Sequence, residues 1–259
     1  MKSEKILMPL PEMDFDPTEA SVPWKILKEN DIEVIFATPS GKPSKADERM
    51  LTGKGFGILK KLFTASNAVL GYYSDMTQDE KFIDPITYEA IHPNDYSGII
   101  IPGGHSPNAR KYYESKILQN VIVEFFKYNK AIGAICHGVL LVARSKDPKT
   151  GKSVIYDYKT TSLLERQELF SYYLTCLWLG RYFKTYPVTV EKEVKAVLSD
   201  KSNFKEGNLG LRRDSVKNPQ IGYSLRDKNY ISARWFGDAF NFSNEFLQSV
   251  KSMQKSGAQ

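Results

Sequence analysis

The sequence predicts an α/β fold built on a mainly parallel sheet. Two observations support this prediction: short apolar runs alternate with longer segments of helical periodicity, and the apolar runs have the length of buried strands. A strand over residues 5–10, a helix over 20–30 and a strand over 32–39 make the first such unit. Strand, helix and strand in this order are typical of the βαβ unit, whose two strands lie parallel.

A second βαβ unit follows a long interlude. It consists of a strand over residues 98–104, a helix over 115–129 and a strand over 131–136 that runs directly into the apolar helix GVLLVARS. Open α/β sheets bind ligands at the carboxyl ends of their strands. We therefore expect the functional residues where these two strands end.

The C-terminal third supplies the remaining elements. The patterns predict a strand near 159–164, an aromatic helix over 169–183, a helix over 190–198, a polar loop over 199–220, a last strand over 229–235 and a closing helix over 243–255.

We expect one domain, 1–259, because α/β domains often exceed the usual size of about 100–200 residues. Residues of about 44–92 are too polar and too long for a simple crossover between strands. We interpret this segment as an insertion that folds over one edge of the domain, beside the active site.

Composition and charge indicate which kinds of binding partner the chain is expected to lack. The net charge is +6, from 36 basic and 30 acidic residues, but the basic residues are scattered among acids, so we expect no nucleic-acid partner. The chain lacks an apolar run of about 18 residues, so we expect no membrane partner. Two cysteines make no disulfide framework, which predicts a reducing, cytoplasmic location. Three histidines without a Cys/Asp cluster predict neither metal nor cofactor.

Residues 134–138, Ala-Ile-Cys-His-Gly, have the pattern of a nucleophile elbow, in which a strand ends at a nucleophile and turns sharply into a helix. Small residues stand two before and two after Cys136, where the turn tolerates little bulk. The amides at the start of the following helix favour a thiolate, so we expect the pKa of Cys136 to lie below about 8.5. A buried structural cysteine is the alternative interpretation.

Pro-Gly-Gly-His, residues 102–105, ends the preceding strand of the same sheet. Backbone N–H groups of Gly103 and Gly104 can approach a substrate oxygen closely and stabilise an oxyanion, with His105 beside them. The alternative is that these glycines only turn the chain.

The pair of motifs IIIPGGH (99–105) and AICHG (134–138) resembles the ThiJ/PfpI superfamily, which has a class I glutamine-amidotransferase-like, flavodoxin-like fold. This resemblance implies a three-layer α/β/α sandwich, and homodimers are common in the superfamily. The chain looks most like the heat-shock chaperone and glyoxalase III branch, which carries an insertion between its second and third strands.

The resemblance also implies roles for individual residues. Glu19 stands where the superfamily keeps a catalytic glutamate, which would share a proton with Cys136. His137 would complete a Cys-His-acid triad, with Glu168 as the acid that orients it and Glu165 as second choice. A carboxyl buried next to a thiolate is expected to have a raised pKa and to stay protonated.

Three stretches depart from that branch. Val139 replaces a frequent proline, residues 158–186 are longer and more aromatic than usual, and residues 232–239 read SARWFGDA where an Asn-Pro pair is expected. Within the last stretch Arg234 is a candidate for holding a substrate carbonyl or carboxylate; the alternative is a surface arginine. We expect Cys176, which lies among aromatic residues, in the core or an interface.

Two functions fit these features. The first is a cysteine-dependent enzyme that converts methylglyoxal to lactate without glutathione, or a related deglycase or amidase, with a narrow pocket for a two- or three-carbon dicarbonyl. The second is a redox-responsive stress protein or holdase chaperone without dedicated turnover. Both use Cys136, so the motif does not separate them.

Overall fold

The computed structural model describes residues 4–257. These residues contain a seven-stranded sheet with the strand order β5-β3-β1-β6-β7-β9-β8. Neighbouring strands are parallel, except that β8 is antiparallel to β9. The expected α/β class with a mainly parallel sheet is therefore confirmed. The strands are β1 (Lys5–Pro9), β3 (Glu33–Thr38), β5 (Ile86–Thr87), β6 (Gly98–Ile101), β7 (Ala131–Ile135), β8 (Ser224–Asp227) and β9 (Tyr230–Ala233).

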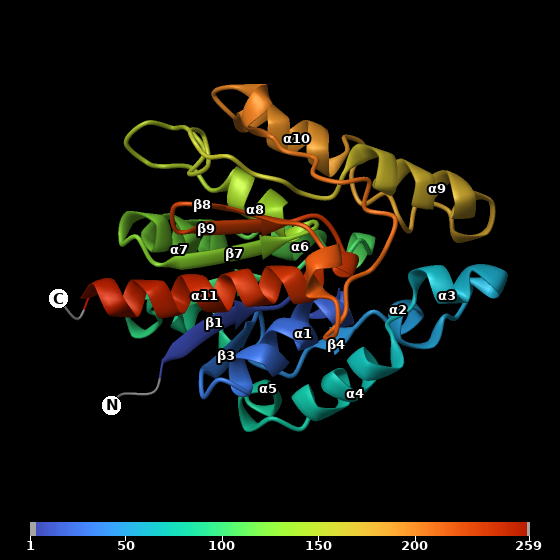
Figure 1. The fold of residues 1–259 in the computed structure, drawn as a ribbon, viewed down its shortest axis with the longest axis horizontal. Coiled ribbons are helices and arrows are strands. Elements are labelled where there is room, and N and C mark those ends of the chain that lie inside the picture. The colour runs from blue at the N-terminus through green and yellow to red at the C-terminus, as the bar shows by residue number, and fades with distance from the viewer. Residues whose placement is uncertain (1–3, 258–259) are drawn as a thin grey trace.

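Helices cover both faces of this sheet and complete a three-layer arrangement (Figure 1). Helices α1 (Pro17–Lys28) and α11 (Ala239–Gly257) pack against each other on one face, and α11 contacts β7 and β9. Helices α7 (Lys116–Lys127) and α8 (Gly138–Arg144) lie on the other, with α10 (Val190–Val197) outside α8. Among residues 4–257 no helix is both long enough and apolar enough to cross a bilayer.

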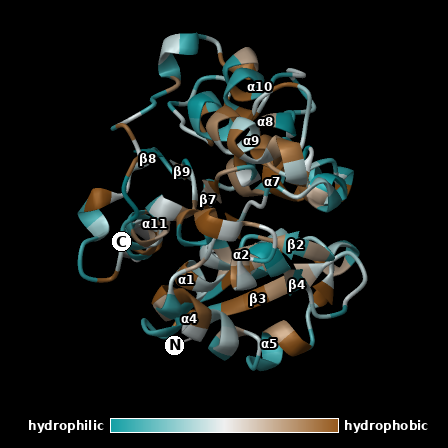
Figure 2. Ribbon diagram, turned by 90° about the vertical axis from the view of Figure 1, so that its right-hand side faces the viewer, coloured by the Kyte–Doolittle hydropathy of each residue, from teal (hydrophilic) through white to brown (hydrophobic). Residues whose placement is uncertain are grey.

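The central strands are continuous apolar runs, which suits them to the buried middle of the sheet. Every residue of β6 and β7 is buried, because helices cover both faces of a parallel strand. Strand β3 likewise appears strongly hydrophobic along most of its length in Figure 2.

Helix α1 begins where the sequence provides a cap. The Asp16 carboxylate accepts hydrogen bonds from the backbone N–H groups of Thr18 and Glu19 at 2.8 and 3.2 Å. Pro17 takes the first helical position, where a missing N–H costs nothing. This cap places Glu19 in the first turn, facing the sheet.

The inserted segment 44–92 contains mainly short helices. These are α2 (Glu48–Thr52), α3 (Lys60–Phe63), α4 (Asn67–Met76) and α5 (Glu80–Ile83), together with β4 (Lys45–Ala46), which pairs with β2 (Met13–Phe15). Helix α4 packs on α1 and α5 on β3, so the segment lies along the β3 side of the sheet.

Three sequence expectations need correction. Residues 159–164 form no strand, because the Thr160 backbone bonds to a loop (its N–H to Asn203 O, 3.0 Å) and the Thr161 N–H donates to Ser232 Oγ at 3.0 Å. The aromatic helix, α9, spans Glu165–Leu179 and starts before the expected position. Strand β8 forms a hairpin with β9 and lies between the expected polar loop (199–220) and the expected last strand (229–235), where the sequence predicted no element. The remaining helix is α6 (Arg110–Tyr113).

The order of the strands locates the functional edge. From β1 the chain adds β3 and β5 on one side and then crosses to add β6, β7 and β9 on the other. The crevice between the carboxyl ends of β1 and β6 is therefore the topological switch point, where doubly wound sheets bind ligands.

Gly138 gives a test of how tightly the turn after β7 is packed. A Cβ at this position would overlap the carbonyl oxygen of Ile101 and lie 2.9 Å from that of Pro102, both rigid backbone atoms. We predict that Gly138→Ala lowers the free energy of unfolding by about 1–3 kcal/mol, measured by urea denaturation.

Gly71→Ala is the matched control. Gly71 lies inside α4, and beyond its own helix backbone no atom lies within 4 Å of an added Cβ, so alanine should stabilise the protein by up to about 1 kcal/mol. Equal effects of the two substitutions would contradict the packing argument.

Candidate active site

Cys136 occupies the sharp turn between β7 and α8. Its φ angle is +58°, a conformation that non-glycine residues adopt only where surrounding structure enforces it. The Cys136 N–H is held by the carbonyl oxygen of Ala233 at 3.1 Å, and Gly138 allows the helix to start against β6. This is the expected elbow geometry, with Cys136 5% exposed at the sheet edge.

Glu19 approaches the same sulfur from α1 and is fully buried. Its Oε2 accepts a hydrogen bond from Gly103 N at 2.8 Å, and its carboxyl interacts with the Cys136 thiol. Burial and the neighbouring Asp16 carboxylate raise the pKa of Glu19 well above its ordinary value, as expected from the sequence. Burial thus favours the protonated form of this carboxyl.

The expected fall in the pKa of Cys136 is wrong. Burial raises the pKa of this thiol well above its ordinary value, and the carboxyl groups of Glu19 and Asp16 raise it further. The hydrogen bond from the His137 backbone acts in the opposite direction but is a smaller contribution. Desolvation thus outweighs the amides at the start of α8, and the resting thiol is neutral.

His137 is ordered by two contacts. Its Nδ1 lies 3.5 Å from Cys136 Sγ, and its Nε2 lies 3.1 Å from Thr185 Oγ1. The Thr185 hydroxyl has one proton and donates it to the carbonyl oxygen of His105 at 2.6 Å. His137 Nε2 must therefore be the donor to Thr185, which leaves the lone pair of Nδ1 facing the sulfur.

Burial keeps this imidazole neutral. Desolvation, together with the positive charges that His105 and Arg144 would contribute, lowers the pKa of His137 to about 3. The side chain is a hydrogen-bond acceptor for the thiol rather than a cation beside a thiolate.

The expected partner of His137, Glu168, is placed differently. Its Oε2 accepts a hydrogen bond from Val190 N at 2.9 Å, and burial raises the pKa of its carboxyl to about 7. Glu165, the second choice, forms an ion pair with Lys192 at 2.6 Å. Thr185 fills the position opposite His137 Nε2 that the acid was expected to take. The carbonyl of Thr185 is in turn held by Arg110 Nε at 2.7 Å.

Gly103 and Gly104, which follow β6, differ in whether their backbone N–H is available to a ligand. Gly103 N–H is bonded to Glu19, so it is not available to a substrate oxyanion. Gly104 has φ +148°, and a Cβ there would lie 2.6 Å from the carbonyl oxygen of Asp14. Of the two, only the Gly104 amide remains a candidate oxyanion donor.

His105 forms part of the cavity wall. Its ring stacks on Phe183 with centroids 4.5 Å apart and meets Tyr182 edge-on at 4.8 Å. Burial lowers the pKa of His105 to about 3, so the ring is neutral. Its Nε2 has no hydrogen-bond partner within the described part of the chain.

The expectation that Arg234 holds a substrate is wrong. The side chain is fully buried and forms a bidentate ion pair with Asp238, at 2.8 and 2.9 Å. Its remaining N–H groups bond to the Glu206 carbonyl at 3.1 Å and to Asn208 at 2.6 and 2.9 Å. All five guanidinium donors are thereby used, and three of them fix the loop around Asn208.

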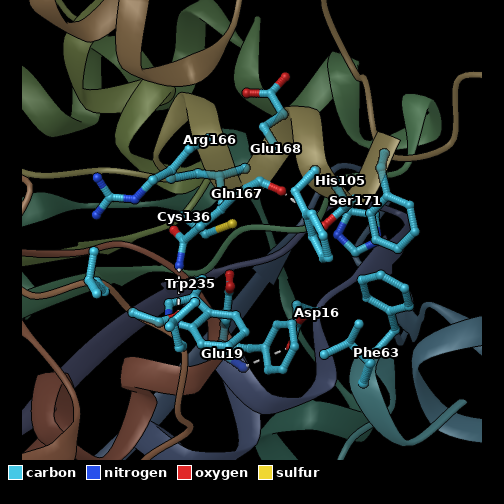
Figure 3. A pocket seen from close by; sticks show the side chains of 18 residues that line it. Asp16, Glu19, Phe63, His105, Cys136, Arg166, Gln167, Glu168, Ser171 and Trp235 are labelled. Carbon is cyan, nitrogen blue, oxygen red and sulfur yellow. Dashed lines mark hydrogen bonds between the residues drawn. The ribbon is translucent and has the colours of Figure 1, made fainter. Parts of the chain in front are cut away.

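A cavity of about 360 Å³ opens above the sulfur (Figure 3). This volume falls in the range of about 300–1,000 Å³ typical of drug-sized ligands, so the expected narrow pocket is wrong. The lining is mostly apolar: Leu62, Phe63, Leu163, Phe170, Phe183, Leu209, Gly210, Leu211, Trp235 and Phe236, with Asp16, Glu19, His105, Cys136, Arg166, Gln167, Glu168 and Ser171.

Cys176 is separate from this cavity. It is partly exposed on α9, in contact with its own helix (Sγ to Tyr173 O, 3.7 Å), and both cysteines are free thiols. Neighbouring apolar side chains of α9 also face solvent, Leu177 at 92% and Trp178 at 53% exposure.

Comparison with known proteins gives three informative similarities. The family model described as ThiJ/PfpI family-like matches residues 10–207. The chain is 26% identical over 152 residues to a glutathione-independent glyoxalase of Schizosaccharomyces pombe, hsp3102, covering 56% of this chain and 58% of that protein. It is 31% identical over 147 residues to the protein/nucleic acid deglycase HchA of Staphylococcus aureus, covering 53% and 46%.

The chain thus spans about half the length of these curated relatives. A further similarity is to the X-ray structure of the rapid encystment protein REP24 of Francisella tularensis. It has a TM-score of 0.71 at 17% identity and covers 95% of this chain and 99% of that one. At this identity the likeness concerns the flavodoxin-like fold alone.

The coupling between Glu19 and Cys136 can be tested by alkylation. Because the Glu19 carboxyl raises the pKa of the thiol, Glu19→Gln should lower the pH midpoint of iodoacetamide labelling of Cys136. A Cys176→Ser background leaves one reactive thiol, and Glu165→Gln, on α9 and paired with Lys192, is the control. An unchanged or higher midpoint in Glu19→Gln would show that the carboxyl does not oppose ionisation of the thiol.

Thr185 can be tested through the protonation of His137. Thr185→Val removes the acceptor for Nε2–H, a hydrogen bond worth about 1 kcal/mol, so the preference for the Nε2–H tautomer should fall about fivefold. Nitrogen-15 NMR of the imidazole reports the tautomer, and Thr185→Ser, which keeps the hydroxyl, should resemble the parent protein. A tautomer unaffected by valine would rule out this role for Thr185.

Proposed function

We propose that this chain, which belongs to the ThiJ/PfpI family, is a cysteine-dependent enzyme that converts α-oxoaldehydes to α-hydroxy acids without glutathione. One observation carries the proposal. The Cys136 thiol lies at a strained turn between the buried carboxyl of Glu19 and the Nδ1 lone pair of His137, at the base of an open cavity. The similarity to a glutathione-independent glyoxalase supports the same reaction class.

The first step is addition of sulfur to the aldehyde carbon. When the Glu19–Cys136 pair has lost one of its two protons, the remaining proton lies on either group, and the form with thiolate and protonated Glu19 is the nucleophile. The new S–C bond forms as the carbonyl π bond breaks. Glu19 gives its proton to the resulting alkoxide, which becomes the hydroxyl of a hemithioacetal.

The second step moves hydrogen between the two carbons. Glu19, now a carboxylate whose raised pKa makes it a stronger base than an ordinary glutamate, removes the proton from C1. Glu19 passes this proton to the ketone oxygen, which gives an enediol. It then takes the proton of the C1 hydroxyl and gives it to C2, so that the C1=O bond of the thioester forms as C2 becomes saturated. C1 is oxidised and C2 is reduced by the same two electrons, so the reaction consumes no external oxidant.

The third step releases the product. Water attacks the thioester carbonyl, with the Nδ1 lone pair of His137 positioned to accept its proton, and the S–C bond breaks. Sulfur leaves as thiolate, and the hydroxy acid departs. The Gly104 amide is our candidate donor to the oxyanion of this step.

The same thiolate would serve a deglycase or amidase reaction. In that case sulfur attacks the carbonyl of a glycated or amide substrate and an amine leaves in place of the C1 proton transfer. The similarity to a deglycase supports this variant of the proposal.

A second candidate is the holdase, favoured by the exposed apolar face of α9. Phe170, Tyr173, Leu177 and Trp178 are between 53% and 92% exposed along this helix. Large exposed apolar surfaces bind other proteins, either unfolded chains or a second copy in a homodimer. Absence of dicarbonyl turnover by the parent protein, combined with suppression of client aggregation by Cys136→Ala protein, would favour the holdase.

Turnover of methylglyoxal tests the enzyme. Purified protein should form lactate without glutathione, and Cys136→Ala should lose at least about 10³-fold in rate, because the covalent intermediate cannot form. Cys176→Ser, whose thiol lies outside the cavity, is the matched control and should keep its activity.

The pH dependence of kcat/KM for methylglyoxal provides a second test of the proposed chemistry. Since burial raises the pKa of both Cys136 and Glu19, kcat/KM should increase as the pH rises above neutrality. Full activity of Cys136→Ala, or a rate that falls over this pH range, would contradict the proposed chemistry.

A further inference from the structure

We infer that the preferred substrate is an α-oxoaldehyde whose ketone carbon carries a bulky, uncharged apolar group, such as an aryl ring, rather than a methyl group. This inference rests on the proposed function and concerns its substrate class. It follows from the size of the cavity, the chemistry of its walls and the distribution of its unpaired polar atoms.

The size of the cavity exceeds what the reacting atoms need. A three-carbon dicarbonyl bound at Cys136 would occupy only a small part of the 360 Å³ above the sulfur. Sites of this size normally bury most of a ligand many times larger than methylglyoxal. The remaining volume is therefore available to a substituent on the far side of the reacting carbons.

Aromatic side chains wall this remaining volume. Phe63 and Trp235 lie on different sides of the cavity in Figure 3. Phe63 is held by Phe183, with ring centroids 4.7 Å apart, and Phe183 in turn stacks on His105. The side chains on this wall are thus fixed by packing. They form a preorganised surface for a flat ring.

Trp235 is also fixed in place. A Cβ on Gly237 would lie 2.5 Å from its indole ring, so the ring packs directly on the backbone there. The buried Nε1–H of Trp235 has no acceptor within residues 4–257. An unpaired buried donor is costly, and a substrate oxygen is an acceptor of the right chemistry.

Charge disfavours an ionised substituent. Three carboxyl groups, those of Asp16, Glu19 and Glu168, line the cavity. The one arginine among the lining residues, Arg166, forms an ion pair with Glu206 at 2.6 Å, so its charge is already compensated. An anionic group on the substrate would lose its hydration without an unpaired cation among these lining residues, and any ionised carboxylate there would repel it, whereas a neutral apolar group would meet neither cost.

The mouth of the cavity extends the apolar surface. Phe170 on α9 and Leu209 and Leu211 on the facing loop line the cavity yet are 58%, 68% and 81% exposed. A bulky substituent that reaches these side chains would remove them from water, which a methyl group cannot do. This burial gives the larger substrate its advantage.

The experiment compares initial rates with phenylglyoxal, 4-carboxyphenylglyoxal and methylglyoxal. We expect kcat/KM for phenylglyoxal to exceed that for methylglyoxal at least about tenfold, the discrimination typical of a filled apolar pocket. The carboxylated ring should lose most of this advantage. Equal or higher kcat/KM for methylglyoxal would overturn the inference.

Substitutions at the mouth of the cavity test where the substituent of the substrate binds. Phe170→Ala and Leu211→Ser should reduce the phenylglyoxal to methylglyoxal ratio severalfold. Leu177→Ser is the control, because Leu177 is on the same helix as Phe170 and is 92% exposed but does not line the cavity. A ratio that changes equally in all three variants would contradict the assignment of the substituent to this cavity.

Binding of unreactive ketones separates this inference from the proposed function. Acetophenone should bind Cys136→Ala protein at least about tenfold more tightly than acetone, measured by calorimetry. If it does but no α-oxoaldehyde is consumed by the parent protein, the proposed reaction is wrong and the apolar ligand class stands. If methylglyoxal is consumed but acetophenone shows no preference over acetone, the reaction stands and the inference is wrong.

Discussion

The close approach of α8 to the end of β6 is the constraint on which the site depends. Only a glycine at position 138 lets the helix start against the Ile101 carbonyl, and this start forces Cys136 into a left-handed conformation at the end of β7. The thiol is thereby directed to the sheet edge, within reach of α1. The left-handed conformation of Cys136 is maintained because the surrounding strands are completely buried and cannot relax around it.

Burial then sets the electrostatics of the site. Glu19 and Cys136 lie together at the base of the cavity, where desolvation opposes any charge. The protein offsets part of this cost with backbone donors, Gly103 N–H for the carboxyl and His137 N–H for the sulfur. Two acids that cannot both ionise easily form a proton-sharing pair, which is suited to moving one proton among the atoms of a bound substrate.

The cavity itself depends on segments far apart in sequence. Met50, Phe56 and Phe63 of the inserted segment pack with Phe183, near the end of the aromatic stretch, in a second hydrophobic cluster apart from the main core. This cluster fixes one wall above the sulfur, and the buried Arg234–Asp238 pair fixes the loop that contributes Leu209 and Leu211 opposite α9. The large apolar volume thus results from additions to the sheet, not from the sheet alone.

The sequence by itself determined the central strands and the elbow at Cys136, because apolar periodicity and a required glycine act through neighbouring residues. The role of Glu19 was implied by the resemblance of its stretch to the ThiJ/PfpI superfamily. Only the tertiary structure decided which groups meet across the chain. Thr185, 48 residues from His137, takes the place expected for Glu168, and Gly103 N–H binds Glu19 instead of substrate. Arg234 was misassigned for the same reason: its partners come from a loop without periodicity, and the folded path of the chain chooses them.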